Sequence, residues 1–110
     1  MKMIVATIRP HKFDAVKDAL AHLRIHQITI FKVMTSDNDP YDSGRIGEES
    51  DLVEKVRIEI SADDDIAPLI VETIREIANT GNVGDGVIAM YDIIQSIRIH
   101  SNEKDKERNL

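Results

Sequence analysis

Residues 52–91 read LVEKVRIEISADDDIAPLIVETIREIANTGNVGDGVIAMY, and this stretch decides the fold of the 110-residue chain. At its start, apolar Val56, Ile58 and Ile60 alternate with charged side chains, which is the period of a strand with one wet face. We therefore expect a strand over residues 52–60, covered on one side and open to water or to a partner on the other.

A helix and a further strand follow within the same stretch. Ser61 and the carboxylates at 63–65 predict a helix start, because a hydroxyl caps free N–H groups and the helix dipole favours negative charge there. Pro68 fits only in the first turn of such a helix. The glycine-rich turn at 80–86 then leads into an apolar strand over 87–91. The apolar stripe of the helix consists of Ile66, Leu69, Ile70, Ile74 and Ile77.

The N-terminal part of the chain carries the same pattern. Residues 2–8 are rich in strand formers and end before Pro10, a helix is expected from Phe13 to about Leu23, and residues 27–34 predict the second strand. The order β-α-β-β-α-β predicts an α+β, ferredoxin-like fold, in which a four-stranded antiparallel sheet carries two helices on one face.

The bare face of that sheet predicts an oligomer. Two of the expected strands are apolar along nearly their whole length, and strands of this kind have a layer on each face. Because one chain supplies helices for only one face, we expect the second layer to come from another copy.

Composition excludes several functions. The chain has no cysteine, so disulfides and thiolate zinc sites are excluded, and its net charge of −6 argues against binding nucleic acid through phosphates. No apolar run approaches the roughly 18–20 residues of a membrane span. The first ten residues are too soon interrupted for a signal peptide, so we expect a cytoplasmic protein.

Two polar segments flank the domain, which we expect over residues 1–100. Residues 35–50 are rich in Asp, Asn, Ser, Gly and Pro and predict a long mobile loop, a feature that is usually functional at this length. Residues 101–110 predict a flexible charged tail.

The glycine-rich turn offers the clearest local site. Gly81, Gly84 and Gly86 permit positive φ, and successive N–H groups in such turns form anion-binding nests. A helix C-cap followed by a tight turn explains the same residues. Arg98 and His100 alternate along a short extended piece and, with Arg9, offer partners for a phosphate; a solvated basic edge is the alternative.

Catalytic and metal-binding patterns are weak. His11, His22 and His26 lack the spacing of metal ligands, and no nucleophile lies beside a credible base, so the sequence carries no enzyme signature. Three carboxylates of the loop resemble a calcium loop whose glycine and terminal glutamate are misplaced. Those carboxylates are Asp37, Asp39 and Asp42.

Several motifs together resemble the PII signal-transduction proteins. They are IRPHKF at 8–13, KVRIEI at 55–60, TGNVGDGVI at 80–88 and IRIH at 97–100, and the resemblance covers about residues 1–103. It implies a non-enzymatic trimer with sheets facing the three-fold axis and adenine nucleotides, ADP or ATP, in the clefts between subunits.

The resemblance also assigns residues. The glycine-rich B-loop holds phosphates, the C-terminal segment of the neighbouring subunit adds basic contacts, and a T-loop at about 35–54 docks on an enzyme or transporter of nitrogen or carbon metabolism. The nucleotide-binding residues so implied are Ile8, Thr29, Lys55, Gly84, Asp85, Gly86, Val87, Arg98 and His100.

Departures from the family pattern predict an atypical member. Val87 stands where a basic residue is usual and His100 where an arginine is, so triphosphate affinity should suffer and ADP or AMP should bind as well as ATP. The loop is about three residues short and lacks its usual Gly-Arg-Gln opening. Tyr41 lies seven residues before the position at which some members are nucleotidylated. These changes put 2-oxoglutarate sensing, a role for magnesium and uridylylation in doubt.

The loop is strongly acidic. Between residues 35 and 54 seven carboxylates face Arg45 alone, which predicts a target protein with a basic surface. The loop residues expected to contact it are Asp37, Asp39, Tyr41, Asp42, Arg45, Glu48 and Glu49. Two alternatives remain: a sensor of another small metabolite or anion, such as bicarbonate or a cyclic nucleotide, and a ferredoxin-like enzyme or metal-tolerance protein.

Overall fold

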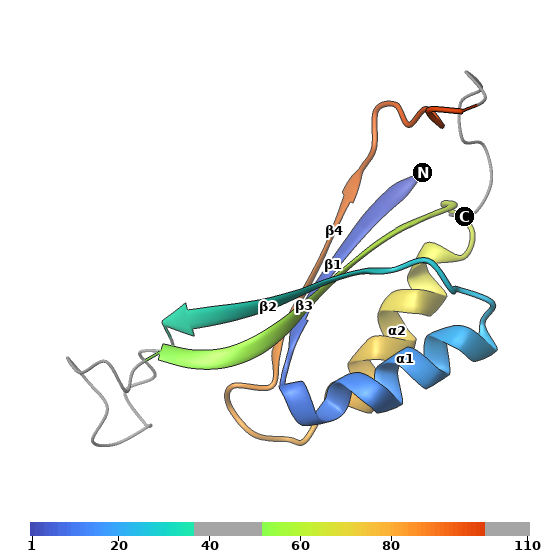
Figure 1. The fold of residues 1–110 in the computed structure, drawn as a ribbon. Coiled ribbons are helices and arrows are strands. Elements are labelled where there is room, and N and C mark those ends of the chain that lie inside the picture. The colour runs from blue at the N-terminus through green and yellow to red at the C-terminus, as the bar shows by residue number, and fades with distance from the viewer. Residues whose placement is uncertain (37–51, 101–110) are drawn as a thin grey trace.

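The computed structural model describes residues 1–36 and 52–100, which fold in the predicted order. The four strands are antiparallel and lie in the order β2-β3-β1-β4, with both helices on one face of the sheet (Figure 1). The predicted ferredoxin-like fold is thereby confirmed. The elements are β1 (Lys2–Ile8), the short 3-10 helix η1 (Pro10–Lys12), α1 (Phe13–His22), β2 (Thr29–Ser36), β3 (Leu52–Ala62), α2 (Ala67–Ala78) and β4 (Gly86–Asp92).

The core lies between the helices and the sheet. Every second residue of the two central strands faces the helices, so that Ile4 on β1 and its partner Ile60 on β3 are both buried. On the helix side, the core is completed by Leu20 of α1 and by Ile70 and Ile74 of α2. Burying a side chain of this size contributes about 1.5–3 kcal/mol, so the alternation in the sequence fixes which face of each strand turns inward.

The opposite face of the sheet carries no helix in the described part of the chain (Figure 1). In the register of the sheet, Thr7 on β1 pairs with Arg57 on β3 and with Val87 on β4, and paired residues share a face. Phe31 and Tyr91 lie on this open face and remain largely exposed. A second copy covering this face stays a prediction.

The helix cap predicted at Ser61 is wrong. Strand β3 continues through Ala62 because that residue still pairs with Lys2 of β1. The helix α2 begins only at Ala67 and has no side-chain cap. Instead, the carbonyl of Asp63 accepts the N–H groups of Ile66, at 3.2 Å, and of Ala67, at 3.0 Å.

The first arm of the hairpin, β2, extends beyond the strand predicted at 27–34, whereas β3 begins at Leu52 as predicted. Thr35 pairs with Val53 and Ser36 with Leu52, so the ends of the predicted 35–54 loop are strand. Figure 1 shows these arms projecting beyond the helices. Residues 37–51, which include all seven predicted target-contacting residues, and the predicted tail at 101–110 lie outside the described residues.

The extended piece predicted at 97–100 is largely absent. Ile97 makes an isolated bridge, and residues 99–100 form a turn. The alternation that would align Arg98 with His100 therefore does not hold in the structure.

Candidate functional site

The glycine loop, residues 80–86, joins α2 to β4 and is closed by a single carboxylate. Asp85 accepts hydrogen bonds from the hydroxyl of Thr80, from the Thr80 N–H at 2.7 Å and from the Gly81 N–H at 3.1 Å. Arg9 donates to the same carboxylate through Nε at 3.0 Å. Through these hydrogen bonds the carboxylate of Asp85 holds the loop in shape.

These contacts change the acidity of Asp85. The Thr80 hydroxyl, followed by the Thr80 N–H and Arg9, stabilises the charged carboxylate and holds the pKa of Asp85 well below its ordinary value. Asp85 therefore remains a hydrogen-bond acceptor throughout the neutral range. Asp85 thus holds the loop in shape, and the ligand contact predicted for it from the sequence stays a prediction.

Two cations bind the loop's carbonyl groups. Arg9, just after β1, donates to the carbonyl oxygen of Val83 at 2.8 Å through Nη2. Lys55 on β3 donates to the carbonyl oxygen of Gly84, and its side chain is almost fully buried, with 4% of the residue exposed. Because these donors come from two neighbouring strands, the loop is fixed against the end of the sheet.

Gly86 permits the closest approach in this region. Its φ is +120°, and a Cβ at this position would lie 1.9 Å from the carbonyl oxygen of Thr7. No other residue fits there without moving the backbone. Glycine at 86 therefore lets β4 begin directly against the end of β1.

A hollow of about 410 Å³ lies on the open face beside the loop. Its volume is within the range of small-molecule sites, and its chemistry combines hydroxyl groups, glycine backbone and one cation. The structure brings four of the predicted nucleotide-binding residues together here, namely Lys55, Gly84, Gly86 and Val87. Sequence reasoning missed the other three described lining residues, Thr7, Thr35 and Ser36.

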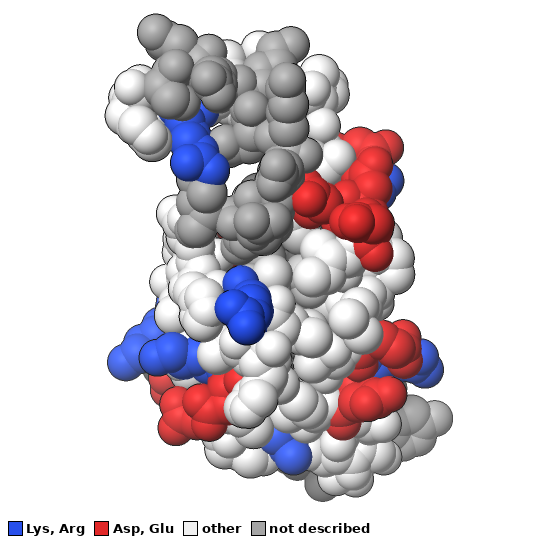
Figure 2. Space-filling view, turned by 90° about the vertical axis from the view of Figure 1, so that its right-hand side faces the viewer, with Lys and Arg blue, Asp and Glu red and all other residues white. Residues whose placement is uncertain are grey.

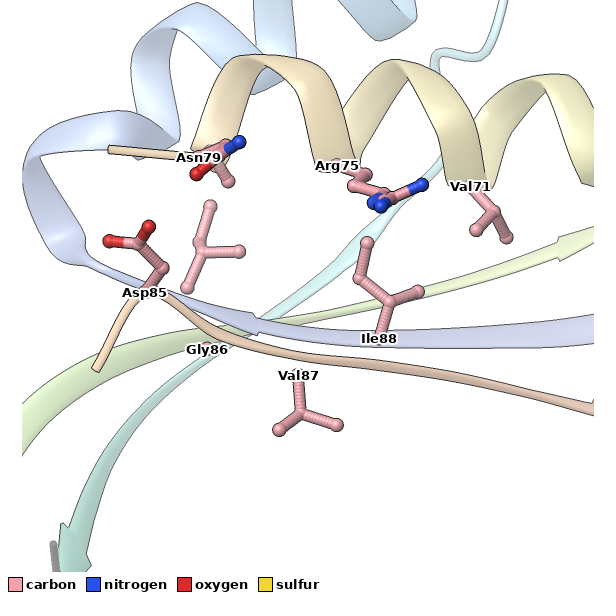
Figure 3. A pocket seen from close by; sticks show the side chains of 9 residues that line it. Val71, Arg75, Asn79, Asp85, Gly86, Val87 and Ile88 are labelled. Carbon is pink, nitrogen blue, oxygen red and sulfur yellow. The ribbon is translucent and has the colours of Figure 1, made fainter. Parts of the chain in front are cut away.

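A second hollow, of about 460 Å³, lies on the helix side of β4, between that strand and α2 (Figure 3). Val71, Arg75 and Ile88 contribute to its wall. Ile8, which the sequence assigned to the nucleotide cleft, lines this hollow with only 1% of its surface exposed. Its neighbour Thr7 faces the open side, where Lys55 lies.

The remaining predicted residues lie away from the open-face hollow within one chain. Thr29 stands at the start of β2 opposite Glu59, whereas the hollow contacts the end of that strand. Arg98 and His100 follow β4, at the end of the strand opposite to the glycine loop (Figure 1). Arg9 therefore does not meet them, contrary to the shared phosphate site considered from the sequence.

Surface charge and metal sites complete the description. Among residues 1–36 and 52–100 no group of three or more His, Cys, Asp or Glu side chains is placed to hold a metal ion. On the face shown in Figure 2, most basic and acidic side chains lie toward the margins, and a basic side chain stands out near the centre among uncharged atoms. Within the same described ranges, no helix is long and apolar enough to span a membrane.

Fold and site together define a small ferredoxin-like binding domain with a preformed glycine loop at the edge of an open sheet. Comparison with known proteins identifies the family to which this domain belongs. The family model described as nitrogen regulatory protein P-II matches residues 1–103. The chain belongs to the P-II nitrogen regulatory protein family.

The similarity spans whole proteins. The chain is 39% identical over 110 residues to nitrogen regulatory protein P-II 1 of Escherichia coli K12, covering 96% of both chains. It is also 39% identical to nitrogen regulatory protein P-II of Pyropia yezoensis, covering 97% of this chain and 98% of the relative. Proteins of this family are non-enzymatic signal transducers that typically bind adenine nucleotides.

Proposed function

We propose that this protein is a homotrimeric cytoplasmic regulator that binds an adenine nucleotide in the open-face hollow. It acts on an enzyme or transporter of nitrogen or carbon metabolism through the loop at 35–54. One observation carries the proposal: a glycine loop, tied down by Asp85, Arg9 and Lys55, forms one wall of a hollow on an uncovered sheet face. Such a loop presents backbone to a phosphate without having to reorganise first.

The rest of the nucleotide site is proposed to come from a neighbouring copy. Thr29, Arg98 and His100 lie away from the hollow within one chain, and the open face carries exposed Phe31 and Tyr91. A copy packed on that face buries these aromatic side chains and brings its own C-terminal segment to the glycine loop. The hollow then becomes a cleft between subunits.

The mechanism we propose is a population shift. Thr35 and Ser36 line the hollow, and they are the last residues of β2 before the acidic segment at 37–51. A ligand in the hollow therefore contacts the stem of that segment. If it binds one arrangement of the stem more tightly than another, it favours that arrangement and so controls docking on a basic target surface.

Calorimetry with ATP, ADP and AMP, each with and without magnesium, tests the proposal, and sedimentation gives the assembly state. We expect trimers and measurable heat with at least one nucleotide. Lys55→Met should weaken binding roughly 10-fold, because a charged hydrogen bond to phosphate is lost. Lys32→Met, which removes an exposed lysine on β2, is the matched control. Absence of heat with all three nucleotides contradicts the proposal.

A second candidate function follows from the same hollow. Lys55 with the hydroxyl groups of Thr7, Thr35 and Ser36 also suits a small anion such as bicarbonate. A thermal-shift screen of small anions, run with and without nucleotide, separates the two functions. If an anion stabilises the protein when nucleotides do not, the protein is an anion sensor.

A further inference from the structure

The helix-side hollow lies at the edge of the sheet, where β4 is the last strand and α2 runs beside it (Figure 3). Its apolar lining comes from Ile8 of β1, from Val71 and Ala78 of α2, and from Ile88 of β4. Ile8 and Ala78 are only 1% and 6% exposed, so they form the inner part of the lining. With a volume of about 460 Å³, the hollow suits the apolar body of a small molecule.

Arg75 is the single basic side chain among the described lining residues of this hollow. It follows Val71 by one helical turn and precedes Asn79 by another, so all three share one face of α2. Figure 3 shows its side chain between α2 and Ile88. Its ion pair with Glu72, at 3.3 Å, joins two side chains that are 72% and 53% exposed, and such pairs contribute little. The guanidinium can therefore turn its other N–H donors to a carboxylate, which it binds through two parallel hydrogen bonds.

The one acidic side chain among the same lining residues, Asp85, already has its partners. Oδ1 accepts from the Thr80 hydroxyl and from Arg9, and Oδ2 accepts from the N–H groups of Thr80 and Gly81. A carboxylate with two donors on each oxygen has no position left for a ligand ammonium group. Figure 3 shows Asp85 at the glycine-loop end of the hollow, apart from Arg75 along α2. The charge that the hollow offers a ligand is therefore the positive charge of Arg75.

We propose that the helix-side hollow is a second binding site, which takes a small monocarboxylic acid with an apolar body, and that Arg75 binds the carboxylate. The apolar body lies against Val71 and Ile88. A second carboxylate or an ammonium group on the ligand would lose hydration against these side chains without gaining a partner. Gly86 and Val87 line both hollows, so the acid site and the open-face hollow lie on opposite sides of the start of β4. The proposal does not depend on nucleotide binding.

The experiment titrates 3-phenylpropanoate into the full, nucleotide-free chain and follows backbone amide shifts by NMR. We expect saturable binding with a dissociation constant of about 1 mM or below, which is ordinary for a ligand of this size. The shifts should change along α2 and β4 and not along β2. Two probes share the carbon skeleton: 3-phenylpropanol lacks the charge, and phenylalanine adds an ammonium group. Each should bind roughly 10-fold more weakly or worse.

Arg75→Gln should weaken 3-phenylpropanoate about 10-fold and leave 3-phenylpropanol unchanged, because it removes the charged donor and keeps much of the side-chain length. Arg24→Gln, which removes an exposed arginine just after α1, is the matched control and should bind as the wild type does.

Three results overturn the proposal: no saturable binding of 3-phenylpropanoate, equal binding of 3-phenylpropanol, or equal affinity in Arg75→Gln. Binding that is weakened by Lys55→Met and not by Arg75→Gln would place the acid in the open-face hollow and also overturns it. If Arg75→Gln does not fold, the comparison of 3-phenylpropanoate with 3-phenylpropanol on the wild type still decides.

Discussion

The glycine loop at 80–86 and the C-terminal segment at 93–100 lie at opposite ends of β4 and differ in how they are held (Figure 1). The loop is closed by Asp85 and fixed by donors from the ends of two strands. The segment instead exposes Ile94 and Ile99 almost completely, at 101% and 99%. One half of the proposed site is therefore complete within the chain, and the other half is suited to a partner.

The physical reason is the kind of contact that each region makes. The hydrogen bonds that Thr80 and Gly81 donate to Asp85 are local, joining residues five and four positions apart, and Arg9 adds a contact from the end of β1. Apolar side chains such as Ile94 contribute only when surface is buried, at about 25 cal/mol per Å². The contrast predicts that damage to the loop destabilises the fold, whereas damage to the segment affects binding.

The largest effect is expected from Gly86→Ala. Its Cβ would lie 1.9 Å from the Thr7 carbonyl oxygen at a φ of +120°, so β4 must move away from β1. We expect a loss of at least about 3 kcal/mol, combining backbone strain and overpacking. Gly81→Ala is the control, because its φ of +80° adds strain of about 1–2 kcal/mol but its Cβ meets open space. Urea unfolding at one protein concentration measures both, and equal losses would contradict the close-approach argument.

A smaller effect, dependent on pH, is expected from Asp85→Asn. The pKa of Asp85 is lowered in the folded state, so its charge stabilises the fold above the ordinary carboxyl pKa of about 3.9. That stabilisation is lost as the pH falls toward the folded-state value. The wild type should exceed Asp85→Asn in urea midpoint at pH 7, and the difference should shrink below about pH 4.

Glu76→Gln provides the control, since it removes the same charge from an exposed position on α2. Its midpoint should follow that of the wild type at each pH. A difference between wild type and Asp85→Asn that persists unchanged to about pH 2 would show that the carboxylate charge does not hold the loop.

The sequence predicted the sheet and helices well because alternation and helical spacing directly report burial. It placed the helix start at Ser61 too early, because cap preference is weaker than the pairing of Ala62 with Lys2. Pairing across strands is a long-range property that local patterns do not contain. The extension of β2 through Thr35 and Ser36 was missed for the same reason.

The candidate site was predicted less completely. Successive strand residues point to opposite faces, so an assignment shifted by one residue moves a side chain across the sheet, as between Ile8 and Thr7. Only the register of the folded sheet shows that Thr7 lies on the same face as Lys55, whereas Ile8 faces the helices. The contacts of Asp85 within the loop could not be predicted, because the order of residues 80–86 does not show which way the carboxylate turns.

The smallest effect on the stability of the fold is expected from Arg98→Ala. This variant also tests most directly the contrast between the glycine loop and the C-terminal segment. If the C-terminal segment serves a neighbouring copy, this change should weaken AMP, ADP and ATP alike by about 10-fold, the value of one charged hydrogen bond. The urea midpoint and the assembly state should stay as in the wild type. Arg75→Ala, at the helix-side hollow, removes an arginine without touching the proposed nucleotide site and should bind nucleotides normally. Unchanged nucleotide binding by Arg98→Ala would mean that the half of the site at the glycine loop is sufficient by itself, and a lower midpoint would place Arg98 in the fold.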